Sequence, residues 1–354
     1  MLRKLRIVAV LFALAVFSNA AVDSSPDALR EAGHWKRLRQ VMEARAANPR
    51  DASAAYYLSC VKTAMGETDS AMELAQRAVT LEPGNSQYHL QLGVLFGRKA
   101  QKASMFKAMG LAGRYKDEMK KAVELDPKNI EAIWELMEFY WHAPGIAGGD
   151  QKKARTLAGD IMRLNAAKGN LALAELADKQ EADIEDYYHK AEQADGKSYE
   201  VQMRLARFYA SDKQKKYDLA EKHARQAITI DGGRIGGYKV LAAIRAQQER
   251  WRELESLLGE AESHVPDDLS PNFHAGLEIL LAGKDPARAE RYFRKYLMQE
   301  PEGYSPRLSR AHWRLGQALE KQGRKAEAIA EMESALRLEP DLDEAKKDLK
   351  ALKR

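Results

Sequence analysis

The stretch from Ser309 to Pro340 carries two apolar stripes with helical spacing, separated by a glycine. Apolar or small residues recur at i, i+3, i+4 and i+7 and then resume after Gly323 until Pro340 ends the pattern: His312, Leu315, Gly316, Leu319, Ala328, Met332 and Ala335. Residues at this spacing share one helical face, so the two helices are expected to pack face to face. Gly316 and Ala328 are small enough to let the two backbones approach closely. The stretch therefore predicts one helical hairpin.

The same pattern returns along most of the chain. Thirty-four residues separate the closing Pro49 from Pro83, and the same distance separates Gly232 from Pro266. Ala, Leu, Glu, Lys, Arg and Gln dominate the composition while β-branched residues are sparse, which favours helix throughout. The 354 residues therefore predict an all-α protein built as one long repeat array.

The order of residues in 309–340 resembles the tetratricopeptide repeat (TPR), a helix-turn-helix unit of about 34 residues. The motif runs large-x-x-Leu-Gly-x-x-large, then Ala-x-x-x-large, then Pro, although His312 and Leu319 stand where the family prefers aromatic residues. The resemblance implies a TPR-like α-solenoid, a right-handed superhelix of antiparallel helix pairs. The resemblance also implies that the protein binds other molecules, but it does not identify those partners.

The chain is predicted to contain four consecutive segments. The prediction comprises a signal peptide at 1–20, an N-terminal capping half-repeat at 21–51, about eight repeats over 52–340 with a degenerate unit at 165–197, and a C-terminal capping helix at 341–354. The two caps are expected because terminal units of a solenoid must present a polar face to water.

The first twenty residues have the composition of a secretory leader. Arg3, Lys4 and Arg6 precede an uninterrupted apolar run over 7–17, and Ser18-Asn19-Ala20 supplies small residues for cleavage. The run is much shorter than the roughly 20 residues that span a bilayer, so a membrane anchor is the weaker interpretation. The sequence thus predicts export to the periplasm or beyond, with no integral membrane segment in the mature chain.

Charge and cysteine content narrow the classes of partner and site. Removing the leader takes three positive charges and lowers the formal net charge from +5 to +2. Mixed signs spread along the chain do not favour nucleic acid, whose partners usually carry a basic stripe. Cys60 is the only cysteine, which excludes an internal disulfide, and its place on an apolar helical face predicts a buried side chain.

Neither a catalytic motif nor a cofactor or metal motif is recognisable. The eight histidines are scattered, without metal-ligand spacing, and the acidic residues Glu181, Asp183, Glu185 and Asp186 favour a solvated helix face. The alternative is a hydrolase or transferase whose site lies in the irregular region 142–196.

Two irregular segments interrupt the repeats. Residues 97–115 are basic and carry Met105, Phe106, Met109 and Leu111, so they could lengthen both helices and project, or form a longer hairpin whose apolar residues pack on each other. A membrane-surface role for 98–114 is a further alternative. The turn at 142–150 contains three glycines and could bind an anion, and Asp150 is placed to cap the helix that begins at Gln151.

The resemblance also implies where a partner would bind. In TPR proteins the first helices of successive units line a concave groove, and their contact positions fall here on Tyr56, Trp134, Trp141, Met203, Arg207, Lys239, Arg310, Trp313, Gln317 and Lys321. Aromatic and basic side chains of this kind suit an extended peptide or an amphipathic helix. The sequence therefore predicts a non-enzymatic scaffold of the cell envelope that binds a protein or peptide, while its oligomeric state stays open.

Overall fold

The computed structural model describes residues 25–177 and 181–354, and there the chain is entirely helical, with 19 α-helices and one short 3-10 helix. This confirms the all-α prediction. The predicted leader, 1–20, lies outside the described residues.

The helices follow one another through short connections. In chain order they are α1 (Pro26–Ala32), α2 (Trp35–Ala46), α3 (Ala52–Ala64), α4 (Thr68–Leu81), α5 (Ser86–Gln101), α6 (Met105–Leu125), α7 (Ile130–His142), η1 (Gly145–Ala147), α8 (Gln151–Leu164), α9 (Ala166–Glu175), α10 (Glu181–Ala194), α11 (Tyr199–Ala210), α12 (Tyr217–Ile230), α13 (Gly236–Gln247), α14 (Trp251–His264), α15 (Ser270–Leu281), α16 (Pro286–Tyr296), α17 (Leu308–Glu320), α18 (Lys325–Leu338) and α19 (Asp343–Leu352).

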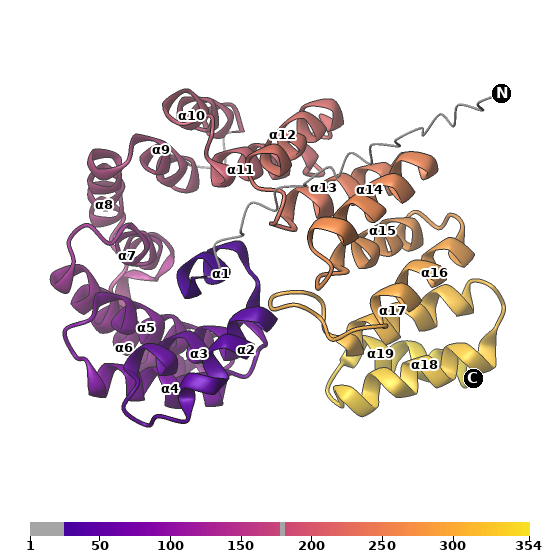
Figure 1. Ribbon diagram of the computed structural model, residues 1–354, viewed down its shortest axis with the longest axis horizontal. Coiled ribbons are helices and arrows are strands. Elements are labelled where there is room, and N and C mark those ends of the chain that lie inside the picture. The colour runs from indigo at the N-terminus through magenta and orange to yellow at the C-terminus, as the bar shows by residue number, and fades with distance from the viewer. Residues whose placement is uncertain (1–24, 178–180) are drawn as a thin grey trace, which may run out of the picture.

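From α3 to α18 the helices form successive hairpins that stack into a solenoid (Figure 1). Each hairpin packs against the next. The first helices of adjacent units are also in contact, for example α3 with α5 and α13 with α15. The helical pair α1–α2 precedes this array and α19 follows it. The TPR-like solenoid expected from the repeat pattern is therefore the observed fold.

Close helix packing within a hairpin depends on small residues, as the 309–340 stretch predicted. A Cβ on Gly316 would lie 2.9 Å from the Met332 Cγ and 3.1 Å from the Ala328 carbonyl oxygen. Both distances are shorter than ordinary contacts, and Ala328 is fully buried. Glycine at 316 thus permits the approach of α17 to α18 that holds the last hairpin together.

The irregular segments also fold as helical hairpins. Residues 97–115 lengthen α5 to 16 residues and α6 to 21, whereas α3 and α7 have 13 each. The prediction that the extra residues lengthen both helices is confirmed. The alternative in which their apolar residues pack on each other holds only for Leu111, since Met105, Phe106 and Met109 are exposed.

The segment expected to be a degenerate unit contains α9 and α10, which pack against each other. Leu171, Leu176 and Ala191 are buried there. Residues 178–180 between the two helices, and the side chain of Glu181 named in the acidic cluster, lie outside what the structure describes.

The solenoid curves until its first units meet loops of its last units, and so forms a closed ring (Figure 1). Lys36 on α2 donates from Nζ to the backbone oxygens of Asp267, at 2.5 Å, and Glu300, at 2.8 Å. The amide of Tyr304, in the loop between α16 and α17, donates to the Ala64 carbonyl at 2.9 Å. We call this contact between α2–α3 and the loops 265–268 and 297–307 the ring closure.

Ion pairs and aromatic packing support the ring closure. Arg37 pairs with Asp267 at 2.8 Å and Arg39 with Glu300 at 2.7 Å. The rings of Trp35 and Tyr304 meet edge to face with centroids 5.5 Å apart. No repeat spacing predicted this contact, because its partners lie more than 200 residues apart in the chain.

Candidate functional site

First helices of the hairpins supply much of the lining of four cavities in the ring, and these cavities share lining residues. In order around the ring we name them A to D, with volumes of about 440, 680, 660 and 480 Å³. Arg98 and Glu135 line both A and B, Lys102 and Arg307 both B and C, and Lys239 and His274 both C and D. The shared walls make the four cavities one interior groove.

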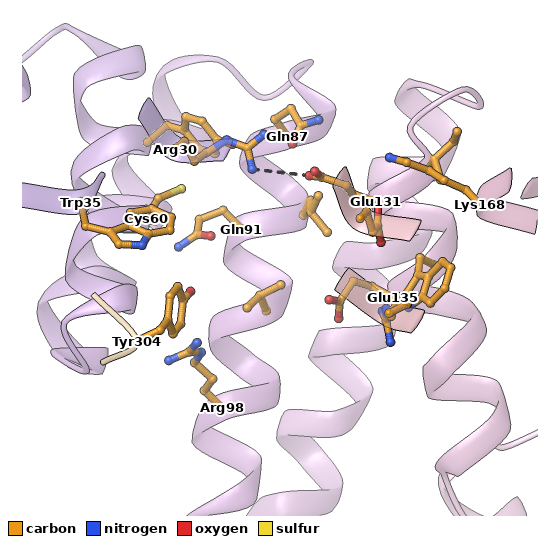
Figure 2. Close-up of a pocket in the computed structure, with 17 residues that line it drawn as sticks. Arg30, Trp35, Cys60, Gln87, Gln91, Arg98, Glu131, Glu135, Lys168 and Tyr304 are labelled. Carbon is orange, nitrogen blue, oxygen red and sulfur yellow. Dashed lines mark ion pairs between the residues drawn. The ribbon is translucent and has the colours of Figure 1, made fainter. Parts of the chain in front are cut away.

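Cavity A lies beside the ring closure and mixes aromatic side chains with both signs of charge (Figure 2). Tyr304 reaches it from the loop before α17, and Arg98 lies over the Tyr304 ring at 5.3 Å from the centroid. Arg30 and Glu131 point toward each other across the cavity, with a closest distance of 3.7 Å (Figure 2). Four aromatic, four cationic and three carboxylate side chains line it: Trp35, Tyr56, Trp134, Tyr304, Arg30, Arg98, Lys168, Arg204, Glu131, Glu135 and Glu200.

A partly buried carboxyl group marks the boundary between cavities A and B. The Tyr115 hydroxyl lies 2.8 Å from an oxygen of Glu135 and donates to it. Burial raises the pKa of Glu135 despite that hydrogen bond, and it also raises the pKa of Tyr115. The pair therefore forms a polar part of the wall between the two cavities.

The glycine-rich turn forms one edge of cavity B. Gly148 has a φ of 95°, and a Cβ on Gly149 would lie only 1.8 Å from the Ala143 carbonyl oxygen, so the turn needs glycine at both positions. Asp150 accepts a hydrogen bond from the Lys153 amide at 3.1 Å, which confirms the predicted cap of α8. Since a carboxylate already occupies this helix N-terminus, an anion there would be repelled, which disfavours the anion-binding interpretation.

Cavity C is strongly basic. Five cationic side chains line it against one carboxylate, that of Glu339: Lys102, Lys239, Arg307, Arg310 and Arg314. Arg307 and Glu339 approach to 3.6 Å, and Arg310 lies 3.7 Å from Glu344. Burial and the neighbouring Arg310 lower the pKa of Arg314, as expected where positive charges crowd together with partial loss of water.

Cavity D is mixed in charge, with Arg207 and Lys239 against Asp212 and Glu278, and some of its titratable groups are partly buried. Burial and the nearby Lys239 lower the pKa of His274 to about 4, so its imidazole is neutral near pH 7. Burial lowers the pKa of Lys239 and raises that of Glu278. Each shift disfavours a charge that has been removed from water.

The predicted groove residues fall into different environments. Trp134, Arg207, Lys239 and Arg310 line the interior groove. Tyr56 also lines cavity A but is buried.

The remaining predicted positions have structural contacts or lie elsewhere. Trp313 borders cavity C yet is buried, and its indole N–H and the Gln317 amide both donate to Asp348 on α19. Met203 is buried where α11 approaches Gly236. Trp141, under Arg155, and the exposed Lys321 line none of the four cavities.

Several lining residues could not be found from repeat positions. Tyr304 and Arg307 belong to a loop, Arg30 to the cap, and Lys102 to the end of a lengthened helix. The only signal for any of them was the basic composition of 97–115. Their arrival in one groove depends on the ring closure.

Three sequence predictions concern chemistry. Cys60 is buried as expected, and burial raises the pKa of its thiol to about 12. Of the acidic cluster, Glu185 pairs with Lys216 at 3.1 Å and Asp186 with Lys190 at 2.6 Å, which are surface ion pairs. The described residues include no group of three His, Cys, Asp or Glu placed to hold a metal ion.

Comparison with known proteins agrees with the hairpin architecture. Residues 309–342 match the tetratricopeptide repeat family model. This chain therefore contains a TPR unit, and its solenoid is the TPR type of fold, which offers an extended concave binding surface. No curated protein matches the sequence.

Among solved structures, yeast Tom70 is similar at 14% identity and a TM-score of 0.48, covering 94% of this chain and 87% of its own. A thermophilic TPR protein of Thermus thermophilus has 19% identity and a TM-score of 0.45, covering 52% and 96%. A TPR protein of Parabacteroides merdae has 16% identity and a TM-score of 0.43, covering 86% and 99%. Within the described residues, no helix is both long and apolar enough to cross a bilayer.

Proposed function

We propose that this protein is a non-enzymatic scaffold that binds an extended segment of a partner protein in the interior groove. The observation that carries the proposal is the continuity of cavities A to D through shared lining residues. Aromatic side chains in A supply contact area, and arginines in C supply charged hydrogen-bond donors. A segment of several residues, rather than a compact small molecule, matches such a row of open cavities.

The charge distribution specifies the partner's chemistry further. Cavity C carries a surplus of positive charge, whereas cavity A is mixed. An acidic segment would relieve the repulsion among Arg307, Arg310 and Arg314, and would form charge-assisted hydrogen bonds with them. The partner segment is therefore acidic where it crosses α17.

The proposed place of action is the cell envelope, after export. The basic start, apolar run and small residues of 1–20 support this part of the proposal. Fractionation of cells that express the full chain, with sequencing of the mature N-terminus, tests it. A chain that stays in the cytoplasm with residues 1–20 intact contradicts export.

The groove is tested with fluorescent peptides and the full mature chain. A peptide rich in Asp and Glu should bind more tightly than its Asn and Gln counterpart, and added salt should weaken its binding. The double variant Arg307→Gln with Arg310→Gln should weaken binding of the acidic peptide by about tenfold or more. This is the range expected when charge-assisted hydrogen bonds are lost. Lys321→Gln is the matched control, because Lys321 lies outside the four cavities.

A second variant tests cavity A. Trp134→Ala should weaken the binding of every peptide that spans the groove. The helix content should stay unchanged, because Trp134 is only partly buried. Trp313 is unsuitable for this purpose, since its burial and its bond to Asp348 make its removal a stability change. Peptide binding that is insensitive to both Trp134 and the arginines would disprove the groove assignment.

A further inference from the structure

The tip of the α5–α6 hairpin exposes a compact apolar patch. Met105 is 77% exposed, Phe106 88% and Met109 46%. These residues lie at i, i+1 and i+4 at the beginning of α6, so their side chains emerge from adjacent positions of the first turns. We call these three residues the apolar tip.

The apolar tip projects beyond neighbouring units. α5 has three residues more than α3 or α7, and α6 has seven more than α4 or α8. At 1.5 Å per residue this is an extension of roughly 5 to 10 Å. A Cβ on Gly110 or Gly113 would meet nothing within 4 Å, so this part of α6 has open space beside it.

The segment that carries the apolar tip has only positive charges. Residues 97–116 contain six Lys and Arg and no Asp or Glu. Some of these cations have partners, since Lys99 pairs with Asp69 at 2.8 Å and Arg114 lies over the Phe96 ring at 4.0 Å. Lys107 is exposed beside Phe106, and no described carboxylate lies within ion-pair distance of it.

Exposed Phe and Met beside Lys fit one kind of surface better than others. A convex projection has no groove in which to seat a peptide, whereas the headgroup region of a bilayer accepts shallow insertion of apolar side chains from any convex surface. Uniform positive charge around the tip adds attraction to anionic headgroups. We propose that the α5–α6 tip docks the protein peripherally on an anionic lipid surface.

Docking at the tip would leave the interior groove free. The residues of the apolar tip line none of the four cavities, while Trp134 and Arg310 line the ring interior. Among the cations of the 97–116 segment, Arg98 and Lys102 also line the interior groove. Tests of membrane docking therefore use Lys107 and the apolar tip and leave Lys102 unchanged.

The experiment is co-sedimentation of the full mature chain with vesicles. One set is phosphatidylcholine alone, and the other contains about one third phosphatidylglycerol, at about 0.1 M and about 1 M salt. Binding is expected to the anionic vesicles and to fall with salt. Equal binding to both vesicle types overturns the anionic preference, and no binding to either overturns the proposal.

Three variants assign any binding to the tip. Lys107→Glu changes the charge of the tip by two units and should weaken binding about 25-fold, taking about fivefold per charge. Met105→Ser with Phe106→Ser should weaken it at least about tenfold through lost apolar burial. The control is Met298→Ser, which changes a methionine that is 75% exposed in the loop just after α16.

These substitutions are at exposed positions, so circular dichroism should show unchanged helix content. Tip variants that sediment with vesicles as the parent does would disprove the role of α6. If the parent instead self-associates in sedimentation velocity, and the Phe106→Ser variant does not, the tip is a contact between copies and the lipid proposal is wrong. Neither outcome depends on peptide binding in the groove.

Discussion

The two halves of the ring hold their hairpins together in different ways. One apolar cluster runs continuously from α11 to α19, through four successive hairpins and the terminal helix α19. Three smaller clusters cover α1 to α9, and a fourth joins α9 and α10 to α11, α12 and α13. The two regions also differ in how the first helix of each hairpin begins. A polar side chain caps the backbone at the beginning of α3, α5, α7, α9 and α11. No side chain does so at the beginning of α13, α15 or α17.

This difference follows the spacing of the repeats. Closing positions in the second half return after 34 residues at Pro266 and 35 more at Pro301, so apolar faces stay in register. In the first half, the interval from Pro83 to Pro127 is 44 residues, and the long turn at 142–150 follows. Lengthened helices cannot pack fully against shorter neighbours, and cavities A and B with their charged walls lie there. Cavities C and D lie against the more regular units from α13 to α17, so the irregular spacing accounts for the divided core and not for the presence of cavities.

The largest effect is expected from matched leucine truncations. Leu315→Ala on α17 and Leu95→Ala on α5 each remove a fully buried side chain, and each should cost about 3–5 kcal/mol. Hydrogen exchange should show faster opening across α13 to α19 for Leu315→Ala, but only around α4 to α6 for Leu95→Ala, because their clusters differ in extent. If both variants accelerated hydrogen exchange over an equal number of helices, the two regions would not differ in the extent of their apolar clusters.

The next effect concerns the ring closure that joins the halves. A Cβ on Gly303 would lie 2.5 Å from a Trp35 ring carbon and 2.7 Å from the Ala64 Cβ. Gly303→Val should therefore open the contact at a cost of about 1–3 kcal/mol. Small-angle X-ray scattering should show a larger radius of gyration with unchanged helix content. If the dimensions stay the same, the closure is not what limits the curvature.

The ring closure should also depend on pH. Glu302 is 4% exposed and accepts from the Lys36 amide at 2.9 Å, and burial raises its pKa from 4.5 to about 7. A carboxyl whose pKa is higher in the closed ring favours closure when protonated. Its contribution is present below about pH 4.5 and lost as pH rises toward 7, amounting to at most about 3 kcal/mol.

Glu302→Gln should flatten this pH dependence, with the ring dimensions by scattering between about pH 5 and 8 as the measurement. The nearby Lys36, Arg37 and Asp267 keep their contacts in that variant. Glu300→Gln is the contrasting variant, because Arg39 lowers the pKa of the Glu300 carboxyl. Loss of the Glu300 carboxylate should therefore weaken the ring closure at the higher pH. The same pH response in both variants would contradict the role of Glu302.

The smallest effect tests the helix caps. Asn129 accepts from the Ala132 amide at 3.1 Å and also donates to Ser86 at 2.7 Å. Asn129→Ala should cost about 1 kcal/mol and raise exchange at the beginning of α7. Arg307→Ala at the beginning of α17 should change stability by about 0.5 kcal/mol or less, since its side chain makes no cap. Urea titration of both variants checks the difference.

Much of the fold was predictable because it is local. Apolar residues at i, i+3, i+4 and i+7 determine which face of each helix is buried, so Leu315, Ala328 and Met332 identified the last hairpin and its partner helix. Asp150 predicted the beginning of α8 because a helix cap is also a local interaction, acting within one helical turn. Repeat positions also named Trp134, Lys239 and Arg310, which line the groove.

The sequence by itself determined the helices, the hairpins and the basic composition of the 97–115 segment. Only the tertiary structure decided that α2 meets the loops at 265–268 and 297–307, that Tyr304 and Arg307 enter the groove, and that Trp313 is held by Asp348. The reason is that small changes in the angle between successive units add up over the whole array, and no local pattern encodes their sum. Whether the ends of this solenoid meet is therefore a property of all its hairpins together.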